Sequence, residues 1–191
     1  NIAIKQEVFT ALEKVVASDA IIASNTSSIR IASIAAACEN KDRIAGLHFF
    51  NPVPLMRLVE VIRAPHTSDK TAETLIAIGK FMGRTPVIAK DGPGFLVNLG
   101  GRAYTTEAMR LLHEGVASPA QIDAVMRDCC NFRMGPLELA DLTGIDVNFP
   151  VSQIIFNGYF GDQRLATSPV HEAMQAAGLL GRKTGAGFYT Y

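Results

Sequence analysis

Apolar residues recur at every third or fourth position over the first 17 residues, and this spacing predicts an amphipathic helix. A short apolar run at residues 20–23 predicts a buried strand, which leads into a polar loop at residues 24–28 and a second helix at residues 29–37. A third helix is expected to begin after Ser68, a residue type that caps helices, and to end near Met82. Further apolar runs predict three more strands, at residues 43–50, 58–62 and 86–89.

This alternation of strands and helices indicates an α/β domain with a largely parallel, doubly wound sheet. The segment 91–94, Asp-Gly-Pro-Gly, ends the alternation, and the sequence beyond it has an almost entirely helical pattern. Helices are predicted at residues 95–113, 118–127, 136–145 and 171–177, with a less regular stretch before the last. We therefore expect an α/β domain over residues 1–91 and an all-α domain over residues 92–191.

A Rossmann-like sheet usually opens with a Gly-x-Gly-x-x-Gly turn, whose glycines let backbone N–H groups approach a pyrophosphate. No such turn occurs here, and the glycines at 178–187 neither follow a predicted strand nor precede a helix. The chain also begins at Asn1 without an initiator methionine. These features predict the second half of a Rossmann-like sheet, in a chain that is a fragment of a longer protein.

Charge and composition exclude several classes of partner. Eighteen basic residues balance eighteen acidic ones, so no net positive field is present to hold a polyanion, and we expect no nucleic-acid partner. The apolar stretches fall short of the roughly 20 residues that a membrane span needs, so no membrane partner is expected either. Cys38, Cys129 and Cys130 lack the spacing of metal ligands and indicate reduced thiols in a cytoplasmic protein without a metal.

Candidate acid–base chemistry lies at the end of the second strand. His48 stands where that strand runs out, and ligands of open α/β sheets bind beyond the carboxyl ends of the strands. Glu60 falls inside the next apolar strand, where an unpaired carboxylate would be costly, so it needs a partner such as His48. A histidine held by a buried glutamate can act as a general base. Alternatively, His48 is a satisfied core histidine and Glu60 caps a helix, and the pattern alone does not separate the two interpretations.

Two further polar residues are open to two interpretations each. Ser27 lies in the loop at residues 24–28, where it either contacts a ligand or caps the following helix, as we expect Ser28 to do. Asn98 lies inside a predicted helix although asparagine is a poor helix former, so its side chain is expected to make a specific hydrogen bond. That bond could be made to a ligand or within the protein.

Six segments in series carry a resemblance to a known family. They are Ser-Asn-Thr-Ser-Ser-Ile at 24–29, Gly-Leu-His-Phe-Phe-Asn-Pro at 46–52, Leu-Val-Glu-Val-Ile at 58–62, Pro-Gly-Phe-Leu-Val-Asn at 93–98, Met-Gly-Pro-Leu-Glu-Leu at 134–139 and Lys-Thr-Gly-Ala-Gly-Phe-Tyr at 183–189. Together they resemble the NAD-dependent 3-hydroxyacyl-CoA dehydrogenases, with matching order and spacing over the whole chain. The resemblance implies oxidation of a 3-hydroxyacyl-CoA to a 3-oxoacyl-CoA, with NAD as the cofactor.

The resemblance also implies roles for matching residues. His48 would remove the proton of the substrate hydroxyl. Glu60 would orient the imidazole of His48 and favour its charged form. Ser27 and Asn98 would complete the catalytic set by holding the substrate oxygen and thioester. NAD contacts are implied for Lys5, Asn25, Ser27 and Lys183, and a substrate contact is also expected for Asn51.

The chain departs from the family pattern in the helical domain. Leu99 replaces an arginine, Gly100 and Gly101 occupy a stretch that is usually bulkier, and Arg133 stands where a proline commonly precedes Met-Gly-Pro. The missing glycine turn is the larger departure, because the chain without it could hardly bind NAD alone.

The segment 146–149, Asp-Val-Asn-Phe, together with Arg102, is most similar to enzymes of bacterial phenylacetate breakdown that act on 3-hydroxyadipyl-CoA. Such a substrate ends in a carboxylate, and a carboxylate leaving water needs a cation. Arg102 and Arg133 are the candidates. The alternative is that both are solvated or pair with Glu107 or Asp128.

Two other functions remain open. A 3-hydroxyacid or 6-phosphogluconate type dehydrogenase shares the architecture but relies on a lysine in the helical domain, and the segment 48–52 argues against it. A non-catalytic dimerisation or acyl-CoA-binding module is favoured only by the missing cofactor half. Apolar helix faces such as residues 154–156, together with the resemblance, predict a homodimer through the C-terminal helices.

Overall fold

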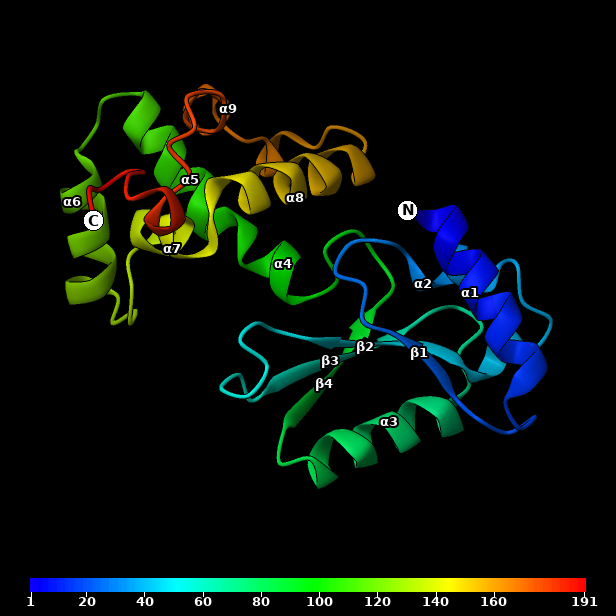
Figure 1. The fold of residues 1–191 in the computed structure, drawn as a ribbon. Coiled ribbons are helices and arrows are strands. Elements are labelled where there is room, and N and C mark those ends of the chain that lie inside the picture. Colours follow the sequence, from blue (N-terminus) through cyan, green and yellow to red (C-terminus); the bar gives the residue numbers. More distant parts are fainter. The chain divides into compact units, whose positions relative to one another are not determined.

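The computed structural model describes residues 1–191 and contains two compact units, Asn1–Leu96 and Val97–Tyr191 (Figure 1). The units divide a few residues beyond the domain limit expected at residue 91. The first unit contains α1 (Ile2–Val15), β1 (Ile22–Ser24), α2 (Ile31–Ala35), a 3₁₀ turn (Lys41–Arg43), β2 (Ile44–Phe49), β3 (Leu58–Arg63), α3 (Asp69–Phe81) and β4 (Thr85–Lys90). These elements follow the predicted alternation.

The four strands form one sheet in the order β1-β2-β3-β4. The β1–β2 and β3–β4 pairs are parallel, whereas β2 and β3 run antiparallel. Only residues 50–57 join β2 to β3, which is too short for the crossover of a dozen or more residues that a parallel pair needs. The sheet is therefore largely parallel, as predicted, with one antiparallel pair at its centre.

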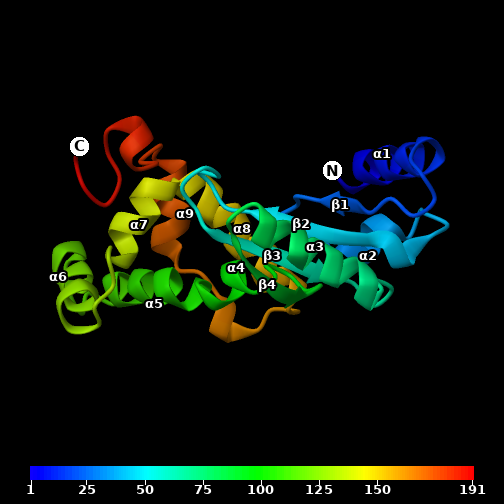
Figure 2. The same cartoon turned by 90° about the horizontal axis from the view of Figure 1, so that it is seen from below.

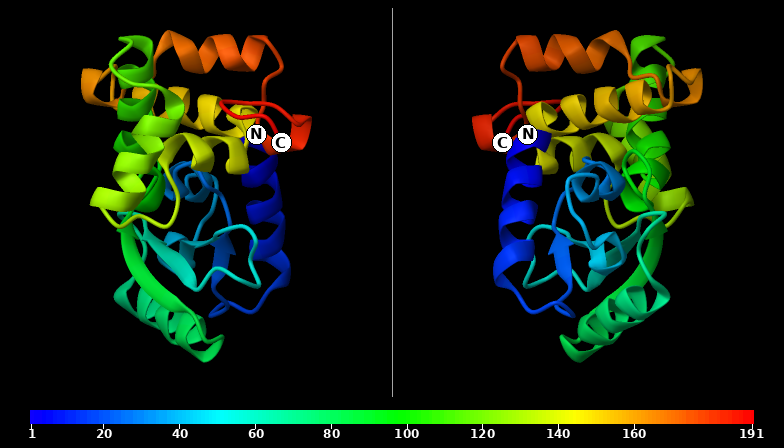
Figure 3. Two further views of the ribbon diagram at one scale, coloured as in Figure 1. Left: turned by 90° about the vertical axis from the view of Figure 1, so that its left-hand side faces the viewer. Right: turned by 90° about the vertical axis from the view of Figure 1, so that its right-hand side faces the viewer.

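Helices cover both faces of this sheet. Neighbouring residues of a strand point to opposite faces, and here both carry apolar side chains that pack against helices. Ile44 and Ile62 pack with residues of α1 and α2 in one core. Ala45 and Val61, their chain neighbours, pack against α3 in another core. Figure 2 shows α3 lying along the strands, and Figure 3 shows α1 and α3 on opposite sides of the sheet. This arrangement confirms the α/β class of the first unit.

The helix caps agree with the sequence at one helix and differ at another. The Ser68 hydroxyl caps α3 by accepting the Thr71 N–H at 3.2 Å, as predicted. The expected capping by Ser28 is wrong, because α2 begins only at Ile31 and its first N–H groups are held elsewhere. Both oxygens of the distant Asp91 accept them, from Ile31 and from the next residue, each at 2.7 Å.

The second unit is all-α, as expected. It contains α4 (Val97–Gly100), α5 (Arg102–His113), α6 (Pro119–Ala124), a π-helical turn (Val125–Cys129), α7 (Pro136–Thr143), α8 (Ile145–Gly158), a 3₁₀ turn (Gln163–Leu165), α9 (Pro169–Ala176) and a 3₁₀ turn (Arg182–Thr184). None of the helices in either unit is long and apolar enough to cross a lipid bilayer.

The expectation of a less regular stretch after residue 145 is wrong, because α8 is a 14-residue helix that contains Pro150. Proline removes a helical hydrogen bond and argues against a helix interior in a sequence. Here Ile145, Phe149 and Ile155 are buried at helical spacing, so tertiary packing offsets the proline. The single helix expected at residues 95–113 is instead broken between α4 and α5, at Gly101.

Two buried carboxylates fasten the C-terminal segment to the rest of the helical unit. Asp123 accepts backbone N–H groups at the start of α7, at 2.9 Å, and the Tyr189 hydroxyl at 2.7 Å. Asp141 accepts the N–H groups of Phe188 and Tyr189 at 3.0 Å and the Tyr191 hydroxyl at 3.1 Å. In Figure 1 this segment, in red, returns to lie beside α7.

Candidate active site

His48 and Glu60 form a buried pair in the middle of the sheet. The antiparallel register of β2 and β3 sets the two residues directly opposite each other, so both side chains leave the same face. His48 Nδ1 lies 2.7 Å from Glu60 Oε2, and the two residues are 5% and 0% exposed. The pairing predicted from the sequence is confirmed.

The other oxygen of Glu60 accepts a backbone hydrogen bond, from the Leu96 N–H at 3.0 Å. Both sequence interpretations of Glu60 therefore hold in part, since it pairs with His48 and also satisfies a backbone donor just before α4. With both oxygens engaged, the carboxylate has a fixed position from which it orients the imidazole.

Two aromatic rings enclose the imidazole. The Phe50 ring centre is 4.6 Å from that of His48, and the Phe95 centre is 5.9 Å from it in an edge-on arrangement. Because Nδ1 is committed to Glu60, Nε2 is the atom left to accept a proton. Sequence reasoning missed these two rings, although both lie within the segments that carry the family resemblance.

The loop after β1 lies at the same end of the sheet as His48, because β1 and β2 are parallel neighbours. The Asn25 side-chain oxygen accepts the Phe49 N–H at 2.9 Å and so ties this loop to the strand that carries His48. Ser27 is exposed beyond it. The Ser24 hydroxyl, at the end of β1, is buried and has no hydrogen-bond partner within the chain. Sequence reasoning passed over Ser24.

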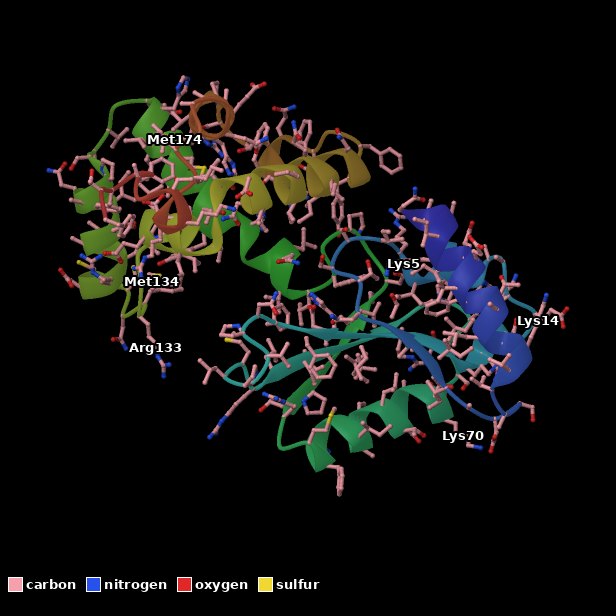
Figure 4. The ribbon with its side chains drawn as sticks, viewed as in Figure 1. Lys5, Lys14, Lys70, Arg133, Met134 and Met174 are labelled. Atoms are coloured by element: carbon pink, nitrogen blue, oxygen red, sulfur yellow. The ribbon has the colours of Figure 1, made fainter.

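The other expected ligand contacts of the first unit are solvent-accessible. Asn51 is exposed in the bend that follows β2, and Lys5 is half-buried on α1. Figure 4 shows Lys5 on the N-terminal half of this helix. His48, Glu60, Asn25, Ser27 and Asn51 thus lie in one unit at or near the ends of β1 and β2.

The remaining expected site residues belong to the helical unit. Asn98 is half-buried in α4. Lys183 forms an ion pair with Asp146 at the start of α8, and the hydrogen bond from the lysine lowers the pKa of this aspartate. Sequence reasoning noted Asp146 only as a subfamily marker and did not predict that pair.

Arg102 and Arg133 have different surroundings. Arg102 is 6% exposed and donates to the Ser152 hydroxyl at 2.8 Å and the Asn148 carbonyl at 3.3 Å, and burial lowers its pKa. It does not pair with Glu107, whose partner is Arg110. Arg133 is exposed and takes part in none of the ion pairs of the chain.

Comparisons with known proteins agree with this geometry over the whole chain. Residues 1–92 match the family model described as 3-hydroxyacyl-CoA dehydrogenase, NAD binding domain, and residues 94–191 match that of the C-terminal domain. A 3-hydroxyadipyl-CoA dehydrogenase from Escherichia coli is 44% identical over 98% of this chain, which covers 40% of that protein. The mitochondrial hydroxyacyl-coenzyme A dehydrogenase of Sus scrofa is 44% identical over 100% of this chain and 61% of its own length.

The fold is also shared with solved structures. The crystal structure of a 3-hydroxybutyryl-CoA dehydrogenase from Escherichia coli superposes with a TM-score of 0.97 at 43% identity, over 100% of this chain and 40% of that one. The chain thus spans 40% to 61% of the length of these relatives. Both family models and the solved structure agree, and the chain belongs to the 3-hydroxyacyl-CoA dehydrogenase family.

Proposed function

We propose that this protein oxidises a 3-hydroxyacyl-CoA to the corresponding 3-oxoacyl-CoA. The observation that carries the proposal is the buried pair of His48 and Glu60, at 2.7 Å, at the carboxyl end of β2. His48 Nε2 takes the proton of the substrate 3-hydroxyl while C3 loses a hydride and its C–O bond becomes a carbonyl. The Glu60 carboxylate stabilises the imidazolium that results, and Phe50 and Phe95 limit the access of water to it.

NAD fits the residues at the end of β1. The Ser24 hydroxyl is a buried polar group without a partner, which a bound amide or ribose would satisfy, and Asn25 and Ser27 are exposed polar groups beside it. NAD supplies the hydride acceptor when bound. We propose that Lys5, Asn25 and Ser27 of the first unit hold it, together with Lys183 of the helical unit. Asp146 holds the ammonium of that lysine.

For the substrate, we propose that Ser27 and Asn98 hold the hydroxyl and thioester oxygens and that Asn51 contacts the thioester portion.

The acyl group is proposed to be 3-hydroxyadipyl, as in phenylacetate breakdown. Two observations support this proposal: a relative is named for that substrate, and Arg133 is a cation outside the ion pairs of the chain. Arg102 was the second candidate for the tail carboxylate. Its guanidinium is already used within the helical unit, so we assign it to support Asn98, whose carbonyl its Nε approaches at 3.5 Å.

The assembly and location are also proposals. We propose a cytoplasmic homodimer formed through the helical unit. Cys38 is buried, Cys129 and Cys130 are exposed, and none is in a disulfide, which suits a reducing compartment.

The proposed activity is tested by mixing the full-length protein with NAD and 3-hydroxybutyryl-CoA or 3-hydroxyadipyl-CoA. Equal amounts of NADH and 3-oxoacyl-CoA are expected to form. The alternative of a non-catalytic acyl-CoA-binding module predicts acyl-CoA binding by calorimetry without NADH, and that result would overturn the proposal.

A further inference from the structure

An open groove lies in the helical unit, where α4 meets α5. It has a volume of about 500 Å³ and is lined by Gly100, Gly101, Tyr104, Leu139 and the segment 132–134. This volume lies within the range of about 300–1,000 Å³ that is usual for small-molecule sites. No residue to which a catalytic role is assigned lines the groove.

Both glycines line the groove, and Gly100 keeps one side of it open. Glycine weakens a helix, so it persists where the backbone or the available space demands it. The backbone does not demand it here, because neither residue has a positive φ, and that of Gly101 is −75°. A Cβ at Gly100 would meet no atom within 4 Å and would project into open space, whereas a Cβ at Gly101 would lie 3.0 Å from the Val97 carbonyl oxygen, so close packing favours glycine there. The absence of a side chain at Gly100 therefore serves to leave room.

The rest of the lining is largely apolar and is held in place. The rings of Tyr104 and Phe132 stack at 4.7 Å with an interplanar angle of 27°. The Tyr104 hydroxyl donates to the Met134 carbonyl at 2.5 Å, and the Phe132 N–H donates to the Met126 carbonyl at 3.1 Å. These bonds anchor the connector between α6 and α7, while Phe132 stays 49% exposed. A ligand therefore meets a preformed aromatic surface.

Arg133 gives the groove a positive rim. Arg127, six residues earlier in the chain, is neutralised by Glu138 at 2.5 Å, whereas Arg133 is in none of the ion pairs. Figure 4 shows Arg133 and Met134 together on this connector, with the Arg133 side chain extending away from the helices. A ligand that is apolar along its length and anionic at its end complements this surface.

We propose that this groove is the subsite for the acyl tail, in which the glycine pair admits the carbon chain and Arg133 meets a terminal carboxylate. The assignment rests on the proposed function, in which Asn98 holds the thioester end of the substrate. Gly101, which also lines the groove, follows Asn98 by three residues and continues the helical turn through its N–H, which donates to the Val97 carbonyl at 2.8 Å. Residues three apart lie on the same face of a helix, about 4.5 Å apart along its axis. A short acyl chain reaches that distance, whereas the nucleotide end of CoA is separated from the thioester by the pantetheine arm.

The test is direct binding, measured by calorimetry on the full-length protein with adipoyl-CoA, hexanoyl-CoA and CoA alone. The wild type is expected to bind adipoyl-CoA about tenfold more tightly than hexanoyl-CoA, and Arg133→Gln should remove most of this preference. Gly100→Leu should weaken binding of both acyl-CoAs by about tenfold or more, because the side chain fills the groove, and Gly100→Ala should weaken it less. Arg110→Gln, an exposed arginine outside the groove, is the matched control, and thermal unfolding reports whether each variant folds.

The outcomes separate the groove from the proposed function. If acyl-CoAs bind with affinities that neither Gly100→Leu nor Arg133→Gln alters, the groove assignment is wrong and the proposed function stands. If Arg133→Gln weakens CoA alone as much as adipoyl-CoA, the arginine meets the nucleotide and the tail assignment is wrong. Should Gly100→Leu change the sedimentation of the protein without changing either affinity, the groove is an interface between copies. If no acyl-CoA binds at all, both the proposed function and the groove assignment fail.

Discussion

At the scale of single residues, the central feature of the candidate site is the carboxylate of Glu60, which is fully buried in the sheet. A buried charge is tolerated only when its partners compensate for the lost hydration, and Glu60 has His48 and the Leu96 N–H for this purpose. The register of β2 and β3 places His48 directly opposite Glu60, so the two side chains lie next to each other. The proposed acid–base pair is therefore built into the sheet rather than into a loop.

Replacing Glu60 by glutamine keeps the shape of the side chain but removes the charge that stabilises a protonated His48. We expect kcat for 3-hydroxyacyl-CoA oxidation to fall by about tenfold or more, or ~1.4 kcal/mol of transition-state stabilisation. Glu73→Gln, at an exposed position of α3, is the matched control. A Glu60→Gln enzyme with unchanged kcat would reduce this carboxylate to a structural role.

His171 gives the helical unit a dependence on pH. It is fully buried, its Nδ1 bonds to the Thr167 hydroxyl at 2.8 Å, and its Nε2 has no partner. Burial, with a smaller contribution from the charge of Arg102, lowers its pKa from 6.5 to about 4. The unfolded chain therefore binds a proton between pH 6.5 and 4 that the folded chain does not, and stability falls as the pH falls through this window.

From pH 7 to pH 5 this histidine should cost about 2 kcal/mol of unfolding free energy. In His171→Gln, which does not titrate, the loss between these two pH values should be smaller by that amount. Urea denaturation at both pH values measures the difference between the wild type and the variant. If the wild type and the variant lost equal amounts of unfolding free energy between pH 7 and pH 5, His171 would have to stay uncharged in the unfolded chain or become charged in the folded one.

At the scale of elements, sequence patterns predict a helix correctly where the contacts that stabilise it lie within or next to the helix. The periodicity of α1 and the Ser68 cap of α3 are visible in the sequence and are present in the structure. The sequence pattern places the start of α2 two residues too early, because the cap of this helix, Asp91, lies 60 residues away from Ile31. The pattern does not indicate helix α8, because Pro150 argues against a helix and only burial of its apolar face outweighs that preference.

The same distinction applies to the candidate site. His48 and Glu60 could be paired from the sequence because an apolar strand with a carboxylate demands a partner. The pair of Lys183 with Asp146 and the enclosure of His48 by Phe95 depend on contacts between distant segments, which no periodicity reveals.

Two Gly→Ala substitutions in the helical unit should have opposite effects. Gly135 has an ordinary backbone φ of −70°, but a Cβ there would lie 2.3 Å from Asp123, the carboxylate that caps α7. We expect Gly135→Ala to destabilise the protein by about 1–3 kcal/mol through overpacking. Gly100→Ala places its methyl group in open space within a helix and should stabilise by about 0.5–1 kcal/mol.

Urea denaturation of both variants measures this contrast. If Gly135→Ala were as stable as the wild type, Asp123 could move aside without cost, and the interpretation of α7 as a helix capped by a fixed carboxylate would be wrong.

At the scale of the whole molecule, each unit has a core of its own, and the helical unit still exposes large apolar side chains. Of the face expected at residues 154–156, Ile155 is buried within its own unit and Ile154 is 44% exposed. Phe160 is 97% exposed just beyond α8. Exposed apolar groups of this kind are what an interface between copies would cover.

We expect the full-length protein to sediment as a dimer at micromolar concentration. Phe160→Asp should weaken the dimer, whereas Phe81→Asp, at an equally exposed position of the first unit, should leave it intact. A monomer in the wild type would contradict the proposed assembly, and equal effects of the two variants would place the interface elsewhere.

The rate of NADH formation from a 3-hydroxyacyl-CoA by the full-length protein carrying His48→Ala shows most directly whether His48 is the catalytic base. General base catalysis usually contributes about 10²- to 10⁴-fold, so kcat should fall by that factor while the protein stays folded. His66→Ala, the exposed histidine of the same unit, controls for the loss of an imidazole and should leave kcat unchanged. A His48→Ala enzyme that retained more than about a third of the wild-type kcat would contradict the claim that this histidine is the catalytic base.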